Sequence, residues 1–540
     1  MILAHILLLA AWMDGYPRDP RVDVVNYSFR IELSDTTDAI VGRAAVDVRF
    51  TAAGVTEVVL DLVDRSEPDG KGMMVSGVTE RGTALQYEHR ERRLRIYLPA
   101  PSTEGQRVTL DVEYRGVPRT GLIIGKNRYE ERTFFSDDWP DKARNWLPMV
   151  DHPSDKATGE LAIVAPSHYQ VISNGRLVEE TDLPGDQRLT RWRQSVPIAS
   201  WLYALGVARF AVDRRPDWHG IPIETWVYAQ DREAGWHDFA EPTRDVLSFF
   251  DESIGPYSYE KLANVQSNSV KGGMEAATTI FYEDKSVAGD RSLKWRNVVI
   301  HEIAHQWFGN AVTESDWNDV WLSEGFATYF TLLFIEHAYG RDEFVRGLEK
   351  SRQDVLDYYR HEPEYRVVHA DLRDMSKVTS WATYQKGAWT LHQLRHEVGD
   401  EAFWAGIRLY YRRFRDRNAS TSDFRSAMEE ASGKRLEPFF TQWLYRGGVP
   451  KLRGGWRYDA SRRMVTVALE QLEVPGGQFT MPLEVGITDS VGGAERVERI
   501  QLGGTEREWS FHAEREPTRV ALDPGTWALF EADFRRFPAR

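Results

Sequence analysis

The sequence contains no cysteine among its 540 residues, so disulfide bonds and thiolate metal ligands are excluded. A metal ion, if one is bound, must be held by His, Asp or Glu side chains. Basic residues are also outnumbered, because 68 Lys and Arg stand against 82 Asp and Glu, for a formal net charge of -14. Binding to nucleic-acid phosphates needs an excess of positive charge, and we therefore expect no nucleic-acid partner.

The sequence also lacks an apolar run long enough to cross a bilayer, so no transmembrane segment is predicted. Residues 2–12, ILAHILLLAAW, resemble the apolar part of a secretion signal, although no Lys or Arg precedes them and no A-x-A cleavage pattern follows. We interpret residues 1–15 as a candidate leader, which favours a periplasmic or secreted protein over a cytoplasmic one. The alternative is an apolar segment that packs on the first domain.

Hydrophobic periodicity predicts a β-domain towards each end of the chain. Over residues 16–214, apolar residues alternate with polar ones, as at Val25 and Tyr27, and this period of two indicates strands with one buried face. We expect a β-sandwich or a large curved, saddle-shaped sheet there. Alternation returns after the glycine-rich stretch 445–455, and residues 447–540 are expected to form a small β-sandwich.

The middle of the chain, residues 215–446, changes to a helical period. Four stretches have helical spacing and end at a glycine suited to cap a helix C-terminus: EPTRDVLSFFDESIG, LKWRNVVIHEIAHQWFG, LSEGFATYFTLLFIEHAYG and DFRSAMEEASG. The sequence therefore predicts an α+β multidomain protein, with a helical middle domain between two β-domains.

Two histidines stand four residues apart in one of these predicted helices. On a helix, His301 and His305 face the same way one turn apart, so both imidazoles can reach a single ion. Catalytic zinc takes three protein ligands and leaves its fourth position to water. Glu324 is the natural third ligand, because it opens the next predicted helix, which we expect Ser323 to cap. Glu302 is too close to His301 to share its coordination and is suited to act as general base on the zinc-bound water. The alternative is a polar helix with two solvated histidines.

The motifs around these residues resemble a known family. HEIAHQWFGN at 301–310 and SEGFATYF at 323–330 match the pattern of the zinc aminopeptidase family that includes aminopeptidase N and the bifunctional leukotriene hydrolase/aminopeptidase. KGGMEAATTIFY at 271–282 resembles the exopeptidase motif of that family, and YQKGAW at 384–389 resembles its tyrosine segment. Residues 134–158 are similar to the stretch that links the first domain to the active site. The resemblance implies a gluzincin with a thermolysin-like catalytic domain and one zinc ion per chain, acting on peptides with a free N-terminus.

The resemblance also implies a role for each further motif. Glu275 would bind the α-ammonium group of the peptide, so that single residues are removed from the N-terminus. Gly272, Gly273 and Met274, which precede it, would let the backbone approach the peptide as an added strand. Tyr384 would donate a hydrogen bond to the oxyanion of the transition state.

Two positions depart from the family pattern. Ala276 stands where an asparagine usually follows the exopeptidase glutamate, and this removes an amide that could support the backbone or the substrate. Trp139 stands where a first-domain Glu or Gln often shares the substrate amine, and Asp138, or alternatively Asp137, could take that role. Arg144 in the same segment is expected to be a structural ion-pair residue.

Many relatives end in a long helical domain that covers the active site, whereas this sequence stops after the predicted C-terminal β-domain. The resemblance therefore implies a short member, for which we expect a more open cleft that admits longer peptides. A non-catalytic peptide-binding protein and a lipid epoxide hydrolase are the alternatives. The intact ligands, base and tyrosine argue against the first, and the expected open cleft argues against the second. The motifs specify neither the oligomeric state nor the preferred N-terminal residue.

Overall fold

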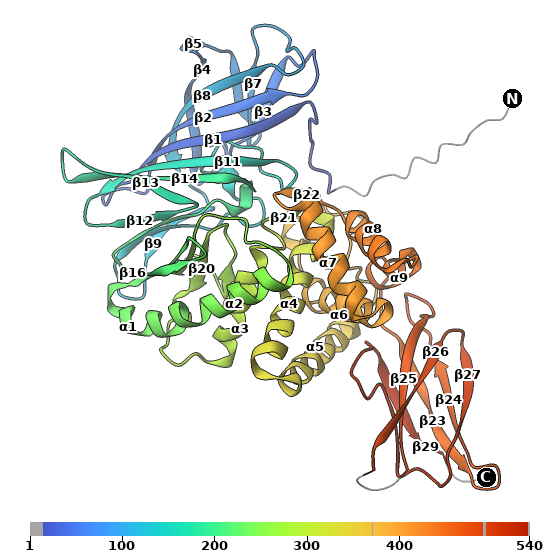
Figure 1. Cartoon of the computed structure of the whole chain (residues 1–540). Coiled ribbons are helices and arrows are strands. Elements are labelled where there is room, and N and C mark those ends of the chain that lie inside the picture. The colour runs from blue at the N-terminus through green and yellow to red at the C-terminus, as the bar shows by residue number, and fades with distance from the viewer. Residues whose placement is uncertain (1–13, 370, 490–492, 538–540) are drawn as a thin grey trace, which may run out of the picture.

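The computed structural model describes residues 14–369, 371–489 and 493–537. β-Sheets make up the first part of the chain, helices accompany a further sheet in the middle, and a small β-domain follows them (Figure 1). The predicted fold class is therefore confirmed. The candidate leader lies outside the described residues except for Asp14 and Gly15. Within the described ranges, no helix is long and apolar enough to cross a membrane.

An eight-stranded sheet forms the body of the N-terminal part. β1 (Val22–Glu32) and β2 (Ile40–Phe50) are antiparallel neighbours, and buried residues of β2 alternate with more exposed ones. This alternation is the pattern that the sequence predicts, because successive side chains of a strand point to opposite faces. The strand order is β13-β14-β11-β1-β2-β8-β4-β5, with β4 at Gly72–Glu80, β5 at Thr83–Ala84, β8 at Arg107–Val117, β11 at Lys156–Pro166, β13 at Arg176–Leu183 and β14 at Gln187–Ala199.

Two smaller sheets complete the N-terminal part. The first has the order β12-β15-β10-β9, with β9 at Leu122–Lys126, β10 at Arg132–Ser136, β12 at Gln170–Ser173 and β15 at Leu205–Ala208. The second has the order β3-β7-β6, with β3 at Glu57–Asp61, β6 at Tyr87–Arg90 and β7 at Arg93–Tyr97.

A five-stranded sheet begins the middle part. Its order is β16-β17-β18-β20-β19, with β16 at Phe210–Trp218, β17 at Ile221–Tyr228, β18 at Leu262–Ser267, β19 at Gly273–Met274 and β20 at Thr279–Glu283. β17, β18 and β20 are parallel, whereas the edge strand β19 is antiparallel to β20. This arrangement places Glu275 directly after the edge strand, which packs beside α3.

Nine α-helices lie in the middle part of the described chain. Their bounds are α1 Arg232–Gly235, α2 Glu241–Ser253, α3 Leu293–His305, α4 Trp321–Tyr339, α5 Arg341–His361, α6 Trp381–Val398, α7 Asp400–Phe414, α8 Thr421–Ser432 and α9 Glu437–Leu444. A short parallel pair joins β21 (Val312–Glu314) to β22 (Arg417–Ala419). α4 is buried along most of its length and packs against α3, α5 and α6, which explains its nearly continuous apolar sequence.

Most of the predicted helix ends are found where glycine was expected to stop the helix. Gly340 follows α4 with φ of 90°, and Gly433 follows α8 in the left-handed conformation that glycine adopts readily. The prediction for α3 is wrong, because this helix ends at His305 rather than at Gly309. After His305 the chain makes a tighter turn, in which Gln306 N donates to Ile303 O. It then turns back, so that Asn310 N donates to His305 O.

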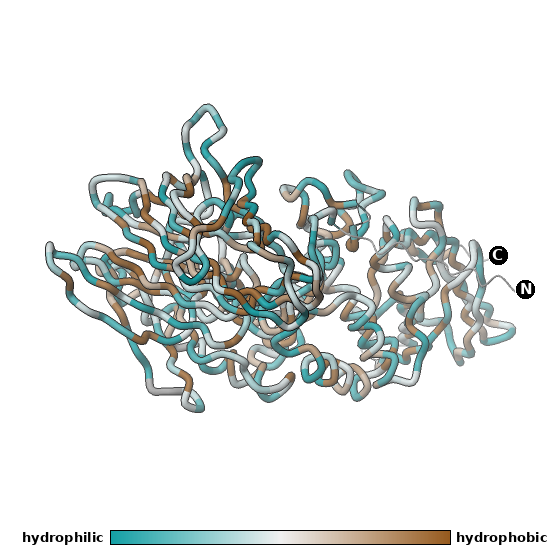
Figure 2. The backbone as a smooth tube through the Cα atoms, turned by 90° about the horizontal axis from the view of Figure 1, so that it is seen from above, coloured by the Kyte–Doolittle hydropathy of each residue, from teal (hydrophilic) through white to brown (hydrophobic). Residues whose placement is uncertain are grey.

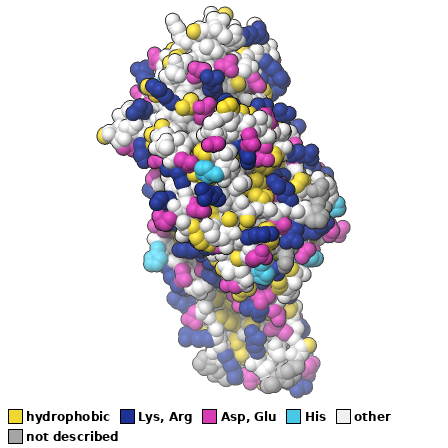
Figure 3. Space-filling view, turned by 90° about the vertical axis from the view of Figure 1, so that its left-hand side faces the viewer, with side chains coloured by type: hydrophobic (Ala, Val, Ile, Leu, Met, Phe, Trp, Pro, Cys, Tyr) yellow, Lys and Arg dark blue, Asp and Glu magenta, His cyan; other side chains and the backbone are white. Residues whose placement is uncertain are grey.

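The C-terminal part is a small β-sandwich, as predicted. One sheet has the order β27-β24-β23-β29 and the other β26-β25-β28, with β23 at Lys451–Asp459, β24 at Met464–Gln471, β25 at Met481–Thr488, β26 at Glu495–Leu502, β27 at Glu506–His512, β28 at Arg519–Leu522 and β29 at Glu531–Arg536. Hydrophobic and hydrophilic stretches alternate along the traced chain (Figure 2). Acidic and basic side chains are interspersed on the face shown in Figure 3.

α4 and α6 cross at a pair of glycines. A Cβ atom placed on Gly325 would lie 2.9 Å from Gly387 Cα, and one on Gly387 would lie 2.9 Å from Gly325 Cα. Only glycine allows the two helix backbones to approach this closely. The crossing matters for the site because Glu324 precedes Gly325 directly, and Tyr384 lies one turn before Gly387.

We expect Gly387→Ala to lower the free energy of unfolding by about 1–3 kcal/mol, because the new methyl group overpacks a backbone contact. Gly347→Ala on α5 is the matched control, since its Cβ meets only the flexible end of Leu332. The control should be neutral or stabilising, because alanine favours helix over glycine by about 1 kcal/mol. Urea unfolding measures both variants, and equal effects would contradict the role of the crossing.

Candidate metal centre and active site

The two histidines and Glu324 converge on one point. His301 Nε2 and His305 Nε2 lie 3.0 Å apart, because four residues of α3 bring both rings to the same side of the helix. Glu324 Oε2 lies 3.4 Å from His301 Nε2 and 3.3 Å from His305 Nε2. These three atoms form a group that could hold a metal ion. The sequence prediction of these ligands therefore corresponds to a real cluster in space.

The second nitrogen of His305 has its own partners. His305 Nδ1 lies 3.1 Å from Phe308 O and 3.1 Å from Ser323 Oγ. A proton on Nδ1 can be donated to the carbonyl, which leaves the Nε2 lone pair free to bind a metal. The prediction that Ser323 caps the helix is wrong: α4 begins at Trp321, so Ser323 lies within its first turn and its hydroxyl faces the histidine instead.

The cluster favours positive charge. Burial opposes the ionisation of Glu324, but His305 and His301 lower its pKa to about 2. Burial likewise opposes the protonation of His305, yet Glu275 and Glu324 raise its pKa to about 10. Glu324 Oε2 is buried without a hydrogen-bond partner. A divalent cation would supply both the charge and the partner, and two imidazoles with one carboxylate are a donor set that suits zinc.

Two further carboxylates surround the cluster. Glu275 Oε1 lies 3.9 Å from His305 Nε2, and Glu302 joins both residues in a second group of potential metal ligands. Burial, with a further contribution from Glu275, holds the pKa of Glu302 well above its usual range. Gly273 lies against Glu302, since a Cβ atom on this glycine would overlap the carboxylate. Gly273, two residues before Glu275, therefore makes room for the Glu302 carboxylate of α3.

Tyr384 reaches the cluster from α6. Its hydroxyl donates to Glu324 Oε1 over 2.9 Å, and its ring centroid lies 6.1 Å from that of His301. Burial, together with the charge of Glu324, holds the pKa of Tyr384 well above its usual range. The phenol therefore keeps its proton and can act as a hydrogen-bond donor at neutral pH.

The residues before Glu275 form the edge of the sheet. Gly272 N donates to Glu283 Oε2 over 3.2 Å, and Gly272 O accepts from Glu283 N over 2.9 Å. Gly272 has φ of 83°, which favours glycine, and Gly273 and Met274 pair with β20. Met274 is buried against the hydrophobic core. Their predicted contact with a substrate stays a prediction.

The first-domain residues near the site have partners of their own. Asp138 is 2% exposed, and its Oδ1 accepts from Trp146 Nε1 over 2.8 Å, while Oδ2 is buried without a partner. Asp137 pairs with Lys142 at 2.6 Å. A role of Asp138 at the substrate amine stays a prediction. The structural role of Arg144 is confirmed, since its Nε lies 2.9 Å from Asp151 Oδ2.

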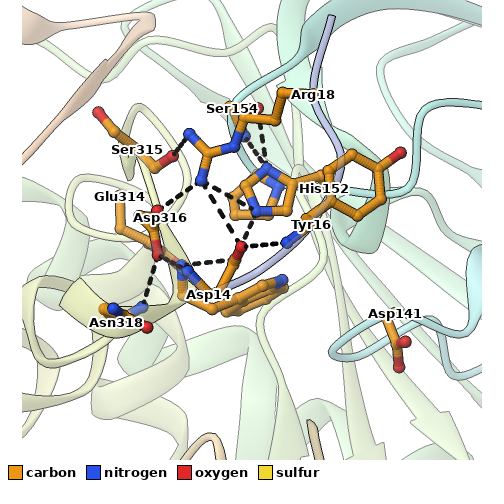
Figure 4. Close-up of polar contacts among 12 residues, drawn as sticks. Asp14, Tyr16, Arg18, Asp141, His152, Ser154, Glu314, Ser315, Asp316 and Asn318 are labelled. Atoms are coloured by element: carbon orange, nitrogen blue, oxygen red, sulfur yellow. Dashed lines mark hydrogen bonds and ion pairs between the residues drawn. The ribbon is translucent and has the colours of Figure 1, made fainter. Parts of the chain in front are cut away.

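The loop before α4 is fixed by a polar network with the start of the described chain (Figure 4). Arg18 Nη2 donates to Asp316 Oδ2 over 2.5 Å, and Arg18 Nη1 donates to Ser315 O over 3.1 Å. Asp14 Oδ2 lies 2.6 Å from His152 Nε2, and Asp14 N donates to Asp316 Oδ1. The network holds the loop that leads to Glu324, and no motif in the sequence indicated it.

The sequence also did not indicate the support for Glu275. Gln306 Nε2 and Asn310 Nδ2 both donate to Glu275 O, over 3.0 and 2.6 Å. Both amides belong to the HEIAHQWFGN motif. Two polar side chains in a stretch that is expected to be buried were the one feature of the sequence that could have indicated this support. The structure thus links the stretch that follows α3 directly to the segment that carries Glu275.

Two protein-family descriptions match this chain. The family description "Peptidase family M1 domain" matches residues 240–443, and "Peptidase M1 N-terminal domain" matches residues 24–202. The chain belongs to peptidase family M1. The M1 match covers α3, α4 and α6, which carry the histidines, Glu324 and Tyr384.

Curated relatives of this M1 chain are aminopeptidases. The chain is 29% identical over 329 residues to glutamyl aminopeptidase of Rattus norvegicus, covering 58% of this chain and 34% of the relative. It is 24% identical over 515 residues to the puromycin-sensitive aminopeptidase of Caenorhabditis elegans, covering 85% of this chain and 51% of the relative. The chain thus spans between a third and a half of the length of these relatives.

Solved structures agree with the fold of this M1 chain. A variant of the M1 zinc metallopeptidase from Deinococcus radiodurans superposes with a TM-score of 0.68 at 25% identity, covering 79% of this chain and 94% of that chain. Aminopeptidase A of Legionella pneumophila, solved with aspartic acid, superposes with a TM-score of 0.81 at 19% identity, covering 98% of this chain and 61% of that chain. At that identity, the second likeness bears on the fold alone.

Loss of a group that hydrogen-bonds to a metal ligand weakens metal binding roughly 10–100-fold. We expect Glu324→Gln to weaken zinc binding by more than this, because it removes a ligand and its charge. Glu336→Gln is the control on the same helix, where the carboxylate pairs with Arg341 at 2.8 Å. Metal analysis after loading with zinc and dialysis measures both. Full zinc retention by Glu324→Gln would contradict its role as a ligand.

Proposed function

We propose that this chain is a zinc aminopeptidase that removes the N-terminal residue from peptides with a free α-ammonium group. The observation that carries the proposal is the position of the Glu275 carboxylate, 3.9 Å from His305 Nε2. An ammonium group paired with Glu275 would place the first peptide bond beside the metal cluster. This pairing would register the substrate by its N-terminal residue, which is the requirement for an aminopeptidase.

His301, His305 and Glu324 would hold the zinc ion. When bound, zinc supplies a Lewis acid that polarises a carbonyl and makes water more acidic. The name of the Deinococcus radiodurans relative supports zinc as the metal. The buried and unpartnered Glu324 Oε2, together with the two imidazoles at 3.3 and 3.4 Å, supports the same assignment from the residues of this chain.

Glu302 is suited to move the proton. Its carboxyl group lies in one cluster with Glu275 and His305. In the carboxylate form it can accept a proton from the attacking water and then donate that proton to the leaving amine. The transfer returns Glu302 to its starting state once the peptide bond breaks. The carboxylate lies against Gly273 of the edge strand, where the substrate backbone would lie.

Tyr384 is suited to stabilise the oxyanion. Its hydroxyl lies beside Glu324 in the structure, donating over 2.9 Å, and is therefore close to the position where the scissile carbonyl would be polarised. A donor that is aimed at developing charge lowers the barrier more than it strengthens substrate binding. A non-catalytic peptide-binding protein would have no need for this arrangement of base, donor and ligands.

We expect the purified chain to hydrolyse a fluorogenic leucyl amide but not its N-acetylated form, because acetylation removes the charge that pairs with Glu275. Hydrolysis should stop on chelation and return when zinc is added. Equal hydrolysis of the acetylated form would contradict an aminopeptidase but leave a zinc peptidase standing. If the zinc-loaded protein hydrolysed none of a broad panel of peptide substrates, a peptide-binding protein would be favoured.

At saturating zinc, we expect Tyr384→Phe to lower kcat roughly 10²–10³-fold with little change in KM, because a transition-state contact is lost. The hydrogen bond to Glu324 Oε1 is lost as well, so zinc is kept in excess. Tyr411→Phe is the matched control, since this buried tyrosine donates to Pro256 O over 2.7 Å, away from the cluster. Steady-state kinetics and metal analysis measure both variants. A Tyr384→Phe enzyme with the kcat of the control would exclude the oxyanion role.

A further inference from the structure

Two buried side-chain amides donate to the backbone carbonyl of Glu275, and the inference drawn from them rests on the proposed function. We propose that Gln306 and Asn310 are positioning residues that set the direction of the Glu275 carboxylate for recognition of the substrate ammonium. Neither residue would touch the substrate. We call the side-chain amides of Gln306 and Asn310, together with the Glu275 carbonyl, the two-amide clamp.

The two-amide clamp saturates one carbonyl. Gln306 Nε2 donates to Glu275 O over 3.0 Å and Asn310 Nδ2 donates to the same oxygen over 2.6 Å. Both side chains are fully buried. A carbonyl oxygen has two lone pairs, so two donors use its full capacity and fix the plane of the peptide group next to the Glu275 Cα. Gln306 also accepts from Thr278 N over 3.0 Å, which fixes the end of the same turn.

The Asn310 side of the clamp is itself immobilised. Asn310 O accepts from Lys156 Nζ over 2.8 Å and from Thr313 Oγ1 over 2.8 Å. Asn310 N donates to His305 O over 3.1 Å. Lys156 opens β11 of the N-terminal part, so its ammonium ties that part to the turn that follows the metal-binding helix. The backbone of Asn310 is therefore fixed in place, and so is the side-chain amide that donates to Glu275 O.

The far end of the turn is held from the N-terminal part. Asn174 Nδ2 donates to Ala277 O over 2.6 Å, and Ala277 N donates to Leu202 O over 3.2 Å. Gly175 N donates to Thr278 Oγ1 over 2.8 Å. Residues 275–278 thus form hydrogen bonds with the stretch after α3 on one side and with the N-terminal part on the other.

The clamp is needed because little else directs Glu275. Glu275 Oε1 is buried without a hydrogen-bond partner and lies 3.9 Å from His305 Nε2. The next residue is Ala276, which is buried and offers no side-chain amide. The direction of the carboxylate therefore depends on its own backbone, and the backbone depends on Gln306 and Asn310. A charge-assisted pair is sensitive to such directions, so a small shift would weaken ammonium binding.

The test uses Gln306→Met and Asn310→Leu, each made singly in the zinc-loaded full chain, so that a folding failure of one variant leaves the other to decide. Both substitutions keep the approximate size of the side chain and remove the donor. Calorimetry compares leucinamide with isocaproamide, which lacks the amino group. Every protein compared carries Glu302→Gln, because the proposed enzyme would otherwise hydrolyse leucinamide during the titration. We expect leucinamide to bind roughly tenfold more weakly to each variant, while isocaproamide binding and zinc content stay unchanged.

Gln471→Met is the matched control. Gln471 is also buried and its Nε2 donates to two carbonyls, Phe479 O over 2.9 Å and Gly504 O over 3.0 Å, but it belongs to the C-terminal sandwich. The control should bind both ligands as the unmodified protein does. This separates the loss of a buried amide in general from the loss of the clamp.

Each outcome decides the proposal. A selective loss of leucinamide affinity in either folded variant supports the clamp. Unchanged preference for leucinamide in both variants, or equal weakening of both ligands, overturns it, because the residues would then be irrelevant or merely structural. If the unmodified protein itself binds leucinamide and isocaproamide alike, the proposed recognition of the amine fails and the clamp fails with it. The behaviour of the unmodified protein thus distinguishes the two failures.

Discussion

The contact of Glu324 with His301 and His305 is the interaction on which the rest of the site depends. It requires that the first turn of α4 reach the last turn of α3, with distances of 3.3 and 3.4 Å between the ligating atoms. The polar network around Arg18 and Asp316 holds the loop that joins the two helices. The glycine crossing of α4 and α6 then brings Tyr384 to the second oxygen of Glu324.

Charge explains why so much structure surrounds these few groups. Glu275, Glu302 and Glu324 are all nearly buried, and removing three carboxylates from water carries a large cost unless positive charge compensates. The high pKa of His305 and the low pKa of Glu324 express the same demand. The fold meets it by concentrating the acids around a position where a cation fits, and by fixing each acid through its backbone or a neighbour.

The sequence predicted much of this arrangement for identifiable reasons. Helical spacing placed His301 and His305 on one face, because that relation is local and needs no knowledge of the remainder of the chain. Alternation located the strands on either side, and glycines located the ends of α4 and α8. The errors arose where a tertiary contact competed with a local preference. Ser323 faces His305 rather than capping α4, and α3 stops at His305 so that the chain can turn back to Asn310.

The sequence by itself determined which side chains are the candidates for the chemistry, since the identity and spacing of the histidines and of Glu302 and Glu324 are set within two short segments. Family membership followed from the same segments. Only the tertiary structure decided how these groups are held. Gln306 and Asn310 meet Glu275 across 31 and 35 positions of the chain, and Lys156 meets Asn310 across 154. Contacts over such separations leave no periodic signal in a sequence, because they depend on how whole helices and sheets pack together.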